Sequence, residues 1–445
     1  MSYILGLALI LRLIFINQSL WLDESIEALA LMGRMGPLLT YALADYQPPL
    51  YHLIGWVNTQ AFGYSEIALR LPSLISGMFT VYFVLKIGQL IGNKKVGYIA
   101  GLLAATNPLL IYYSQEGRTY AMTTFFVTAS FYYFIQLLNS KTSDLPRSKA
   151  GLRPKILYLL FTIAYLYTSY LSWFVLLTLG LYALYKKRWD IVILQVIAAL
   201  SLLAWLPSFV SSLAIGQSTR GGSPEWGKVV GGLNWKSLPL TWVKFNIGRI
   251  SFDNKVLYGS LVTGLGLLHL SILKHFDVRK NNILLLWLIP PVLLGLLTAL
   301  VLPVYSYFRL LFVLPAYLLM LSTTTVKWSK IVVVSNILFL AVFWLSPKYH
   351  REDWRTLTRS LDTHSIVAMP SRAQAAPLLY YGWDKPILEP SHESLSGEKI
   401  AYIRYVEDLF DTQKLGQANF AASGYTISSQ KVYPGIQVDI YENSN

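Results

Sequence analysis

Two adjacent carboxylates, Asp23 and Glu24, stand in a polar segment between two apolar runs of the chain. A carboxylate in such a segment can act as a general base toward a hydroxyl group if partial desolvation raises its pKa. The pair could also hold a divalent cation such as Mg²⁺, Mn²⁺ or Zn²⁺. A structural role is available too, because an Asp before a helix caps the N-terminus. The residues alone leave base, metal ligand and helix cap open.

A second polar stretch follows and combines Asp45, Gln47 and a Pro-Pro pair with His52. Proline fixes φ and is tolerated in the first helical turn, so the stretch is typical of a turn that starts a helix. On the functional interpretation, the turn holds Asp45 or Gln47 over the same cavity as Asp23. His52 is either a packed interfacial side chain or a further metal ligand beside Asp23 and Glu24.

Three arginines, Arg70, Arg118 and Arg309, stand at the same predicted ends of apolar segments. A guanidinium group at that depth can bind a phosphate bidentately. It can also simply extend to the membrane surface as an anchor. Arg118 belongs to a tight turn that also contains Glu116. Three arginines converging on one leaflet would exceed what anchoring needs, so we expect an anionic ligand there.

The composition is that of a membrane protein. Of 445 residues, 54% are hydrophobic and 13% are charged, whereas a soluble domain carries about 25% charged residues. The absence of cysteine excludes disulfides and Cys-ligated metal sites. The N-terminal apolar stretch is interpreted as a first span rather than a cleavable signal peptide. About eleven apolar segments predict spans, at 3–16, 69–91, 97–112, 119–138, 156–170, 171–185, 191–210, 256–273, 282–302, 310–325 and 331–346. The count is ten if 156–170 and 171–185 form one span, but the alternation of basic loops favours two.

The basic residues of alternate loops predict the orientation of these spans. Fifteen Lys and Arg residues fall in one set of short loops, and the positive-inside rule places that set in the cytoplasm. The Asp23 loop, the Glu116 turn and the C-terminal region then face outside, in a multi-pass protein of the plasma (inner) membrane. The net charge of +14 belongs to these loops, which excludes a nucleic-acid-binding domain.

The pattern changes after Ser346. We expect a transmembrane domain over 1–346 and an extracytoplasmic soluble α/β domain over 347–445. Within the latter, a helix is predicted at 353–362 and strands at 365–369, 399–406 and 436–441. The first outer loop is expected to contain two interfacial helices, at 25–36 and 49–62.

These residues resemble the GT-C superfamily of polytopic glycosyltransferases, in particular the bacterial family-39-like enzymes related to protein O-mannosyltransferases and to the aminoarabinose transferase of lipid A. Five short motifs occur in the same order as in that group. They are Asp23-Glu24, Gln47-Pro48-Pro49-Leu50-Tyr51, the Ser114–Tyr120 turn, the late segment with Tyr305, Tyr307, Arg309 and Pro315, and Glu352-Asp353-Trp354-Arg355. Gln47 departs from the pattern, because relatives often have His or Lys there.

The resemblance implies an inverting transfer of a sugar from a polyprenyl-monophosphate donor. The acceptor would be a hydroxyl of a lipid, a glycan or a protein on the outer face. Asp23, with Glu24, would be catalytic. No cofactor is certain, but arginines or a cation would stabilise the phosphate leaving group. The implied substrate-binding residues are Asp45, Gln47, Tyr51, Arg70, Glu116, Arg118, Tyr305 and Arg309.

Two other classes of protein fit part of the pattern. A lipid or glycolipid transporter or flippase would bury polar residues near mid-membrane, often in repeated halves. Here the acids lie in a loop, and the sequence contains no internal repeat. A non-catalytic membrane protein could instead use the C-terminal domain to bind glycans. Both alternatives remain beside the glycosyltransferase hypothesis.

Overall fold

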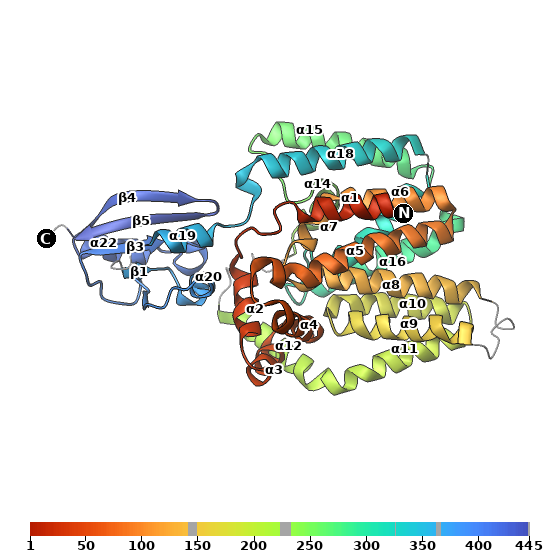
Figure 1. Ribbon diagram of the computed structural model, residues 1–445, viewed down its shortest axis with the longest axis horizontal. Helices are drawn as coiled ribbons and strands as arrows, with labels where there is room; N and C mark the ends of the chain where they lie inside the picture. The colour runs from red at the N-terminus through yellow and green to blue at the C-terminus, as the bar shows by residue number, and fades with distance from the viewer. Residues whose placement is uncertain (141–148, 223–232, 325, 362–365, 444–445) are drawn as a thin grey trace. The chain divides into compact units, whose positions relative to one another are not determined.

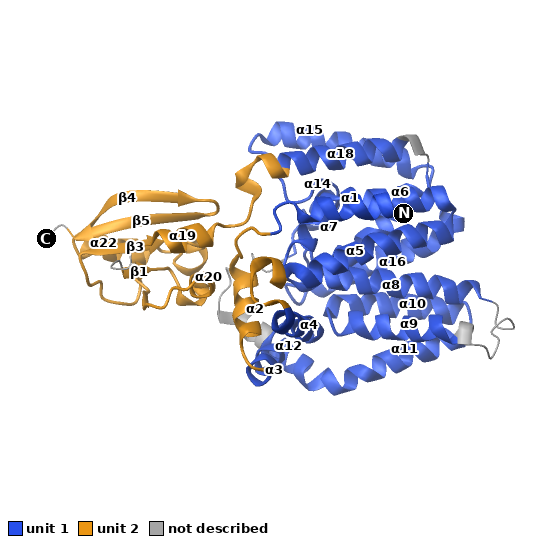
Figure 2. Cartoon of the chain, viewed as in Figure 1, with its two compact units in different colours: residues 1–16, 35–61, 70–342 blue, residues 17–34, 62–69, 343–445 orange. Residues whose placement is uncertain are grey.

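The chain forms two compact units (Figures 1 and 2). The helical unit combines residues 1–16, 35–61 and 70–342, and the α/β unit combines residues 17–34, 62–69 and 343–445. The computed structural model describes residues 1–140, 149–222, 233–324, 326–361 and 366–443. The predicted division at residue 346 therefore differs from the observed one, because two pieces of the first predicted outer loop pack with the C-terminal region.

The helical unit is built from helices of very different lengths. They are α1 Ser2–Leu13, α3 Met35–Ala44, α4 Leu50–Phe62, α5 Glu66–Ile91, α6 Lys94–Thr106, α7 Pro108–Ser114, α8 Thr119–Asn139, α9 Lys149–Leu166, α10 Trp173–Tyr185, α11 Trp189–Ser201, α12 Leu206–Gly222, α14 Ser237–Ile247, α15 Lys255–Leu273, α16 Val278–Ala299, α17 Leu314–Ser322 and α18 Val326–Leu345. The start of α5 belongs to the α/β unit.

The predicted count of eleven spans is not confirmed. In the part of the chain that the structure describes, six helices are long and apolar enough to cross a membrane, or seven if the bent pair α6 and α7 is one span. The other predicted spans include α1, α10 and α17, with 12, 13 and 9 residues, against the roughly 20 residues that a span needs. Segments 156–170 and 171–185 do form two separate helices, α9 and α10. The chain is a polytopic membrane protein.

A buried arginine supports the bend between α6 and α7. The two helices meet at 60°, which leaves the last carbonyls of α6 without helical donors. Arg12 of α1 is wholly buried and donates to the carbonyls of Ala104 at 3.2 Å and Ala105 at 3.1 Å. Its Nε donates to Ser114 Oγ at 3.1 Å. The charge in the predicted first span thus satisfies backbone groups that lipid could not.

Helix α14 lies between the predicted spans 191–210 and 256–273 and is held at its middle and at its C-terminal end. Trp242 Nε1 donates to the hydroxyl of Tyr317 in α17 at 3.0 Å. The helix ends at Gly248, whose φ of +75° is open mainly to glycine. A Cβ at Gly248 would also lie 2.8 Å from Pro108 Cβ. The end of α14 is therefore held against the start of α7.

The α/β unit contains a five-stranded sheet of order β2-β1-β3-β5-β4. Strand β1 is parallel to β2 and β3, whereas β5 is antiparallel to β3 and β4. The predicted helix and three strands are found with shifted ends, and β2 and β4 escaped prediction. The elements are α2 Leu22–Met32, α19 Trp354–Ser360, β1 Ile366–Ala368, α20 Ala376–Tyr380, β2 Ile387–Leu388, β3 Lys399–Ile403, α21 Glu407–Phe410, α22 Leu415–Ala422, β4 Tyr425–Tyr433 and β5 Ile436–Asn443.

Helix α2 joins this unit through its apolar face. Leu22 is part of a core that includes Trp354 of α19, and Ile26 and Leu29 pack against the same core. Burying the Leu22 side chain contributes roughly 1.5–3 kcal/mol, and the partly buried Ile26 and Leu29 contribute less. The interfacial helix predicted over 25–36 is thus in fact two helices, α2 and α3, and α2 packs on the α/β core. The helix predicted over 49–62 is confirmed as α4.

Candidate active site

The two adjacent acids of α2 have different surroundings. Asp23 and Glu24 occupy the first helical turn, but the N-cap is Trp21 and no side chain caps the helix. Glu24 is 2% exposed, and its Oε2 lies 3.5 Å from Nη1 of the buried Arg351. Asp23 remains partly exposed. Asp23 therefore lies inside the first turn of α2 rather than at the N-cap position, while Glu24 faces a buried arginine in an ion pair.

Asp23 lies within electrostatic range of Tyr405. The Tyr405 hydroxyl donates to Glu352 Oε1 at 3.0 Å. Burial, followed by the charges of Glu352 and Asp23, raises the pKa of Tyr405, so that this phenol stays protonated. Glu27, one turn after Asp23, is 2% exposed and lies on the same side of the helix. Periodicity along 23–27 would have pointed to Glu27, which the sequence analysis missed.

The motif from Glu352 to Arg355 builds the α/β unit around α2. Glu352 Oε2 accepts from Trp354 Nε1 at 2.9 Å, and Asp353 Oδ1 caps α19 by accepting from the backbone N–H of Thr356. Trp354 is wholly buried. Arg355 pairs with Glu66 at 2.7 Å. Each of the four side chains thus has a structural role within the unit that carries Asp23.

In the helical unit, Asp45 and His52 form a close pair. His52 Nε2 lies 3.0 Å from Asp45 Oδ2, and the His52 side chain is 1% exposed. Burial alone would raise the pKa of Asp45, but the contact with His52 and the charge of Arg118 outweigh it and lower the pKa. Tyr51 is buried beside His52, and Gln47 is half-buried. An acid with a lowered pKa is a weak base, so Asp45 suits a positioning role.

The Asp45 contact predicts a pH dependence of stability. A group whose pKa is lower in the folded than in the unfolded state stabilises the fold above its unfolded pKa of about 3.9. That stabilisation disappears as the pH falls through the lowered pKa. Asp45→Asn should therefore lower the melting temperature at pH 7, and the difference from wild type should shrink toward about pH 3. A difference that is the same at both pH values would contradict the assignment.

An aromatic cluster brings the Arg118 turn beside the Arg309 segment. The ring of Phe308 lies 5.1 Å from that of Tyr120 and 6.2 Å from that of Tyr113. These rings flank Arg309 on one segment and Arg118 on the other. The predicted convergence of Arg118 and Arg309 is thus supported by packing between their neighbours. The Tyr305 side chain is buried, with 4% of its surface exposed, and its hydroxyl lies 3.0 Å from Thr241 Oγ1 of α14.

A further arginine, Arg249, completes this region. It follows the anchored end of α14, and its Nη1 donates to the hydroxyl of Tyr112 at 3.0 Å while the guanidinium lies 4.9 Å from that ring. Tyr307 and Glu116 lie within electrostatic range of Arg249. Burial, and then the charge of Arg249, lowers the pKa of Lys244 to about 8. Arg249 is therefore the permanent cation at the end of α14, and its side chain is exposed.

Comparison with known proteins places this arrangement in a family context. The family described as dolichyl-phosphate-mannose-protein mannosyltransferase matches residues 46–214, which include the Gln47 and Arg118 motifs. A polyprenol-phosphate-mannose–protein mannosyltransferase of Corynebacterium glutamicum is 29% identical over 102 residues, which are 22% of this chain and 20% of the relative. The matched part thus spans about a fifth of that relative's length.

Solved structures extend the likeness along the whole chain. ArnT from Cupriavidus metallidurans in the apo state has a TM-score of 0.57 at 10% identity, and the match covers 99% of this chain and 97% of that one. The archaeal oligosaccharyltransferase AglB from Archaeoglobus fulgidus, with an inhibitory peptide and a dolichol-phosphate, has a TM-score of 0.53 at 10% identity, over 100% and 74% of the two chains. The family match, the curated relative and these two folds all support a likeness to membrane glycosyltransferases of the GT-C type. The resemblance noted from the motifs is thereby confirmed.

One of the predicted site arginines is buried and has a packing role. Arg70 is 0% exposed, and its Nη1 donates to the carbonyl of Ile16 at 2.8 Å. That carbonyl follows the C-terminus of α1, where backbone acceptors are left over. A contact between Arg70 and a phosphate stays a prediction. Arg249, in contrast, is exposed, and the sequence analysis did not identify it. Its signal, a lone arginine after a glycine in a long loop, is too weak to find from one sequence.

The suggested metal ligands are divided between the two units. Asp23 and Glu24 belong to the α/β unit, and His52 belongs to the helical unit, where it lies against Asp45. Among the residues that the structure describes, no three His, Cys, Asp or Glu side chains gather closely enough to hold a metal ion. A divalent cation bound by Asp23, Glu24 and His52 stays a prediction.

Proposed function

We propose that this protein is a membrane glycosyltransferase that uses a polyprenyl-phosphate sugar. The donor is a polyprenyl-monophosphate sugar, and the acceptor is a hydroxyl group on the outer face of the plasma membrane. The observation that carries the proposal is the region around Glu116, where Arg249, the Arg118 turn and the Arg309 segment come together. The names of the related proteins, which mention polyprenol, dolichol and mannose, support the same class of substrate.

The arginines suit the leaving group of this reaction. The donor's phosphate is a diester of the sugar and the polyprenol, and its bridging oxygen gains negative charge as the bond to the sugar breaks. Guanidinium groups bind such oxygens with two parallel hydrogen bonds, and their charge stabilises the leaving phosphate. Arg249 is exposed and held in place by Tyr112, so it is preorganised for this role.

Asp23 is the proposed base. The acceptor oxygen attacks the anomeric carbon, the bond from that carbon to the phosphate oxygen breaks, and the acceptor proton passes to Asp23. Displacement from the face opposite the phosphate inverts the configuration at the anomeric carbon. No general acid is needed, because a phosphate leaves without protonation. Glu24 is less suited to the step, since its carboxylate faces the buried Arg351.

The direct test offers a radiolabelled polyprenyl-phosphate sugar to the purified protein with lipid, glycan and protein acceptors. Label transferred to an acceptor hydroxyl supports the proposal, and the stereochemistry of the product tests inversion. Label that only crosses the bilayer of a proteoliposome would favour a flippase instead. Failure to transfer label from any polyprenyl-monophosphate sugar to any acceptor would overturn the proposal.

The phosphate site makes a separate prediction for Arg249. Arg249→Gln should weaken the binding of a short-chain polyprenyl phosphate by roughly 10–150-fold, the value of a lost charged hydrogen bond of about 1.5–3 kcal/mol. Arg249→Lys keeps the charge but loses the planar fork, and should recover only part of the affinity. Lys236→Gln removes the same charge from an exposed position before α14 and serves as the control. Equal affinities of the Arg249→Gln and Lys236→Gln proteins would contradict the role of Arg249.

The orientation of the chain is tested by single cysteines, because the sequence has none. We expect Thr412→Cys, exposed in the α/β unit, to react with a membrane-impermeant reagent in intact cells. Lys280→Cys, exposed in the first turn of α16 and part of one of the predicted basic segments, should react only after the cells are permeabilised. The basis is the fifteen basic residues of alternate loops. The reverse labelling pattern would move the α/β unit to the cytoplasm.

A further inference from the structure

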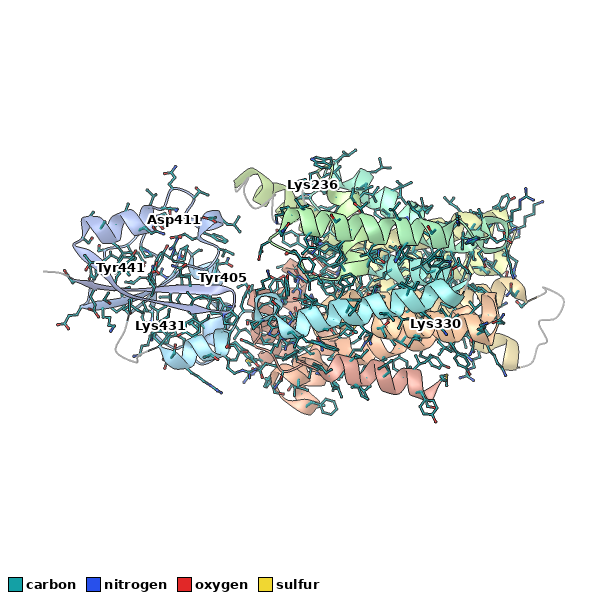
Figure 3. All side chains as sticks on the ribbon, turned by 90° about the horizontal axis from the view of Figure 1, so that it is seen from above. Lys236, Lys330, Tyr405, Asp411, Lys431 and Tyr441 are labelled. Atoms are coloured by element: carbon teal, nitrogen blue, oxygen red, sulfur yellow. The ribbon has the colours of Figure 1, made fainter. Side chains whose placement is uncertain are left out.

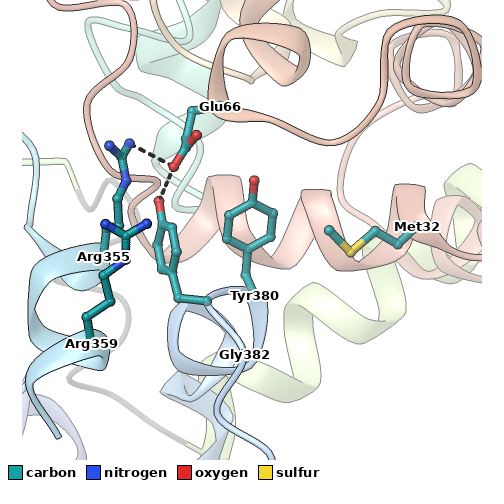
Figure 4. Close-up of a pocket in the computed structure, with 7 residues that line it drawn as sticks. Met32, Glu66, Arg355, Arg359, Tyr380 and Gly382 are labelled. Atoms are coloured by element: carbon teal, nitrogen blue, oxygen red, sulfur yellow. Dashed lines mark hydrogen bonds and ion pairs between the residues drawn. The ribbon is translucent and has the colours of Figure 1, made fainter.

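The α/β unit contains a cleft of about 480 Å³ that the reaction described above does not use (Figure 4). It lies among the end of α2, the start of α5, α19 and α20. Six of its lining residues are Met32, Glu66, Arg355, Arg359, Tyr380 and Tyr381. Its volume falls within the range of small-molecule sites, about 300–1,000 Å³. The two arginines lie at one end and Met32 at the other (Figure 4).

One wall of the cleft is fixed by a hydrogen-bonded network. Arg355 Nη2 lies 2.7 Å from Glu66 Oε1, and the hydroxyl of Tyr381 donates to the same oxygen at 3.0 Å. Arg355 Nη2 also donates to the carbonyl of Asn17 at 2.6 Å, and the backbone N–H of Leu20 donates to the Tyr381 hydroxyl at 2.8 Å. Glu66 therefore balances the charge of Arg355 and holds Tyr381 in position.

Arg359 leaves the cleft with a positive charge. It follows Arg355 by one turn of α19, so the two side chains share one face of the helix. Arg359 is exposed, and the structure records no ion pair or hydrogen bond of its side chain with any described residue. With Arg355 balanced by Glu66, Arg359 supplies one net positive charge to the cleft. A single anionic group is the ligand that this charge favours.

The tyrosines supply a second kind of surface. The rings of Tyr380 and Tyr381 lie 4.9 Å apart at 85°, and Met32 is 39% exposed. Aromatic rings offer an apolar face together with a polar tip, which suits a ligand with C–H and O–H groups. Among the described residues that line the cleft, none belongs to a β-strand, whereas extended peptides bind by backbone pairing to an open strand edge. These contacts favour a sugar over a peptide.

We propose that this cleft binds a phosphate or carboxylate group carried by the glycan part of the acceptor. The inference rests on the proposed function, since it names the class of acceptor for the same transfer. Arg359 would bind the oxyanion, and Tyr380 would lie along the sugar. The site would select acceptors that carry an anionic sugar over neutral ones.

Direct binding to the full-length protein in detergent tests this without donor or turnover. The probes are glucose, glucose 6-phosphate, glucuronic acid, inorganic phosphate and a short acidic peptide, measured by titration calorimetry. Arg359→Gln removes the proposed oxyanion contact at an exposed position. Lys431→Gln removes the same charge from the exposed face of β4 (Figure 3) and is the matched control.

We expect both anionic sugars to bind more tightly than glucose, and more tightly than inorganic phosphate. Arg359→Gln should weaken the anionic sugars by about tenfold and leave glucose unchanged, whereas Lys431→Gln should change neither. Tighter binding of the peptide, equal affinities for glucose and glucose 6-phosphate, or equal effects of the two variants would overturn the proposal, as would no saturable binding. Because binding needs no donor, a failure of sugar transfer with intact binding would count against the proposed function and not against the cleft.

Discussion

Asp23→Asn should lower the turnover of sugar transfer by about 10²–10⁴-fold, the usual contribution of a general base. The amide has nearly the same shape as the carboxylate but cannot accept the acceptor's proton. Asp23 is partly exposed and lies in the first turn of α2 rather than at its N-cap. Because the isosteric change keeps the size of the side chain, the variant should keep the wild-type melting temperature to within a few degrees. It should also bind a polyprenyl phosphate as wild type does. Turnover under saturating donor and acceptor is the measurement.

Two outcomes would count against Asp23 as the base. Near-normal turnover in a folded Asp23→Asn protein would remove it, and Glu27, on the same side of α2, would become the next candidate. Loss of turnover together with a large fall in melting temperature would indicate a structural role. The matched comparison is Glu24→Gln, because this isosteric change at the neighbouring carboxylate is expected to lower stability rather than turnover.

Glu24→Gln should destabilise the α/β unit by roughly 3–5 kcal/mol, the cost of breaking a buried ion pair from one side. Glu24 is 2% exposed, and the Arg351 side chain is 4% exposed. The amide leaves the Arg351 charge buried and poorly compensated. The melting temperature and the denaturation midpoint are the measurements, with protease sensitivity of residues 17–34 as a local readout. Turnover per folded molecule should change far less than in Asp23→Asn.

The double variant separates a pair effect from an effect of Glu24 alone. If Arg351→Met is combined with Glu24→Gln, the buried charge is removed and part of the lost stability should return. Additive losses in the double variant would contradict the ion-pair explanation. A stable but inactive Glu24→Gln protein would instead exchange the proposed roles of the two acids.

Much of the architecture could be predicted from the sequence because lipid imposes strict demands on a chain. Apolar segments with few charges must become helices in a bilayer, and most predicted segments are helices in the structure. The alternation in residues 436–441 predicted β5 correctly, since one face of that strand is buried. The predicted span count is not confirmed, because some apolar helices, such as the 12-residue α1, are shorter than the roughly 20 residues of a typical span.

The residues of the candidate site could be predicted only in part from the sequence. The motif residues at 45–52, 114–120 and 305–309 were identified from residue type and order, and the structure packs Tyr120 against Phe308. Arg249 was missed because its partner Tyr112 lies 137 residues away. No role could be predicted for Arg12 of the first apolar segment, because the carbonyls it binds lie 92 and 93 residues away. Local periodicity carries no information on such pairs.

The sequence by itself thus determined the membrane class, most helices and the acid that we propose as base. Only the tertiary structure decided that α2 belongs with the C-terminal sheet, because its face of Leu22, Ile26 and Leu29 has no recognisable partner in its own loop. The same packing gave the adjacent acids different roles. Glu24 meets a buried arginine that is distant in the chain, while Asp23 stays partly open to solvent. Burial and charge pairing depend on distance in space, and residue order along a single chain does not specify that distance.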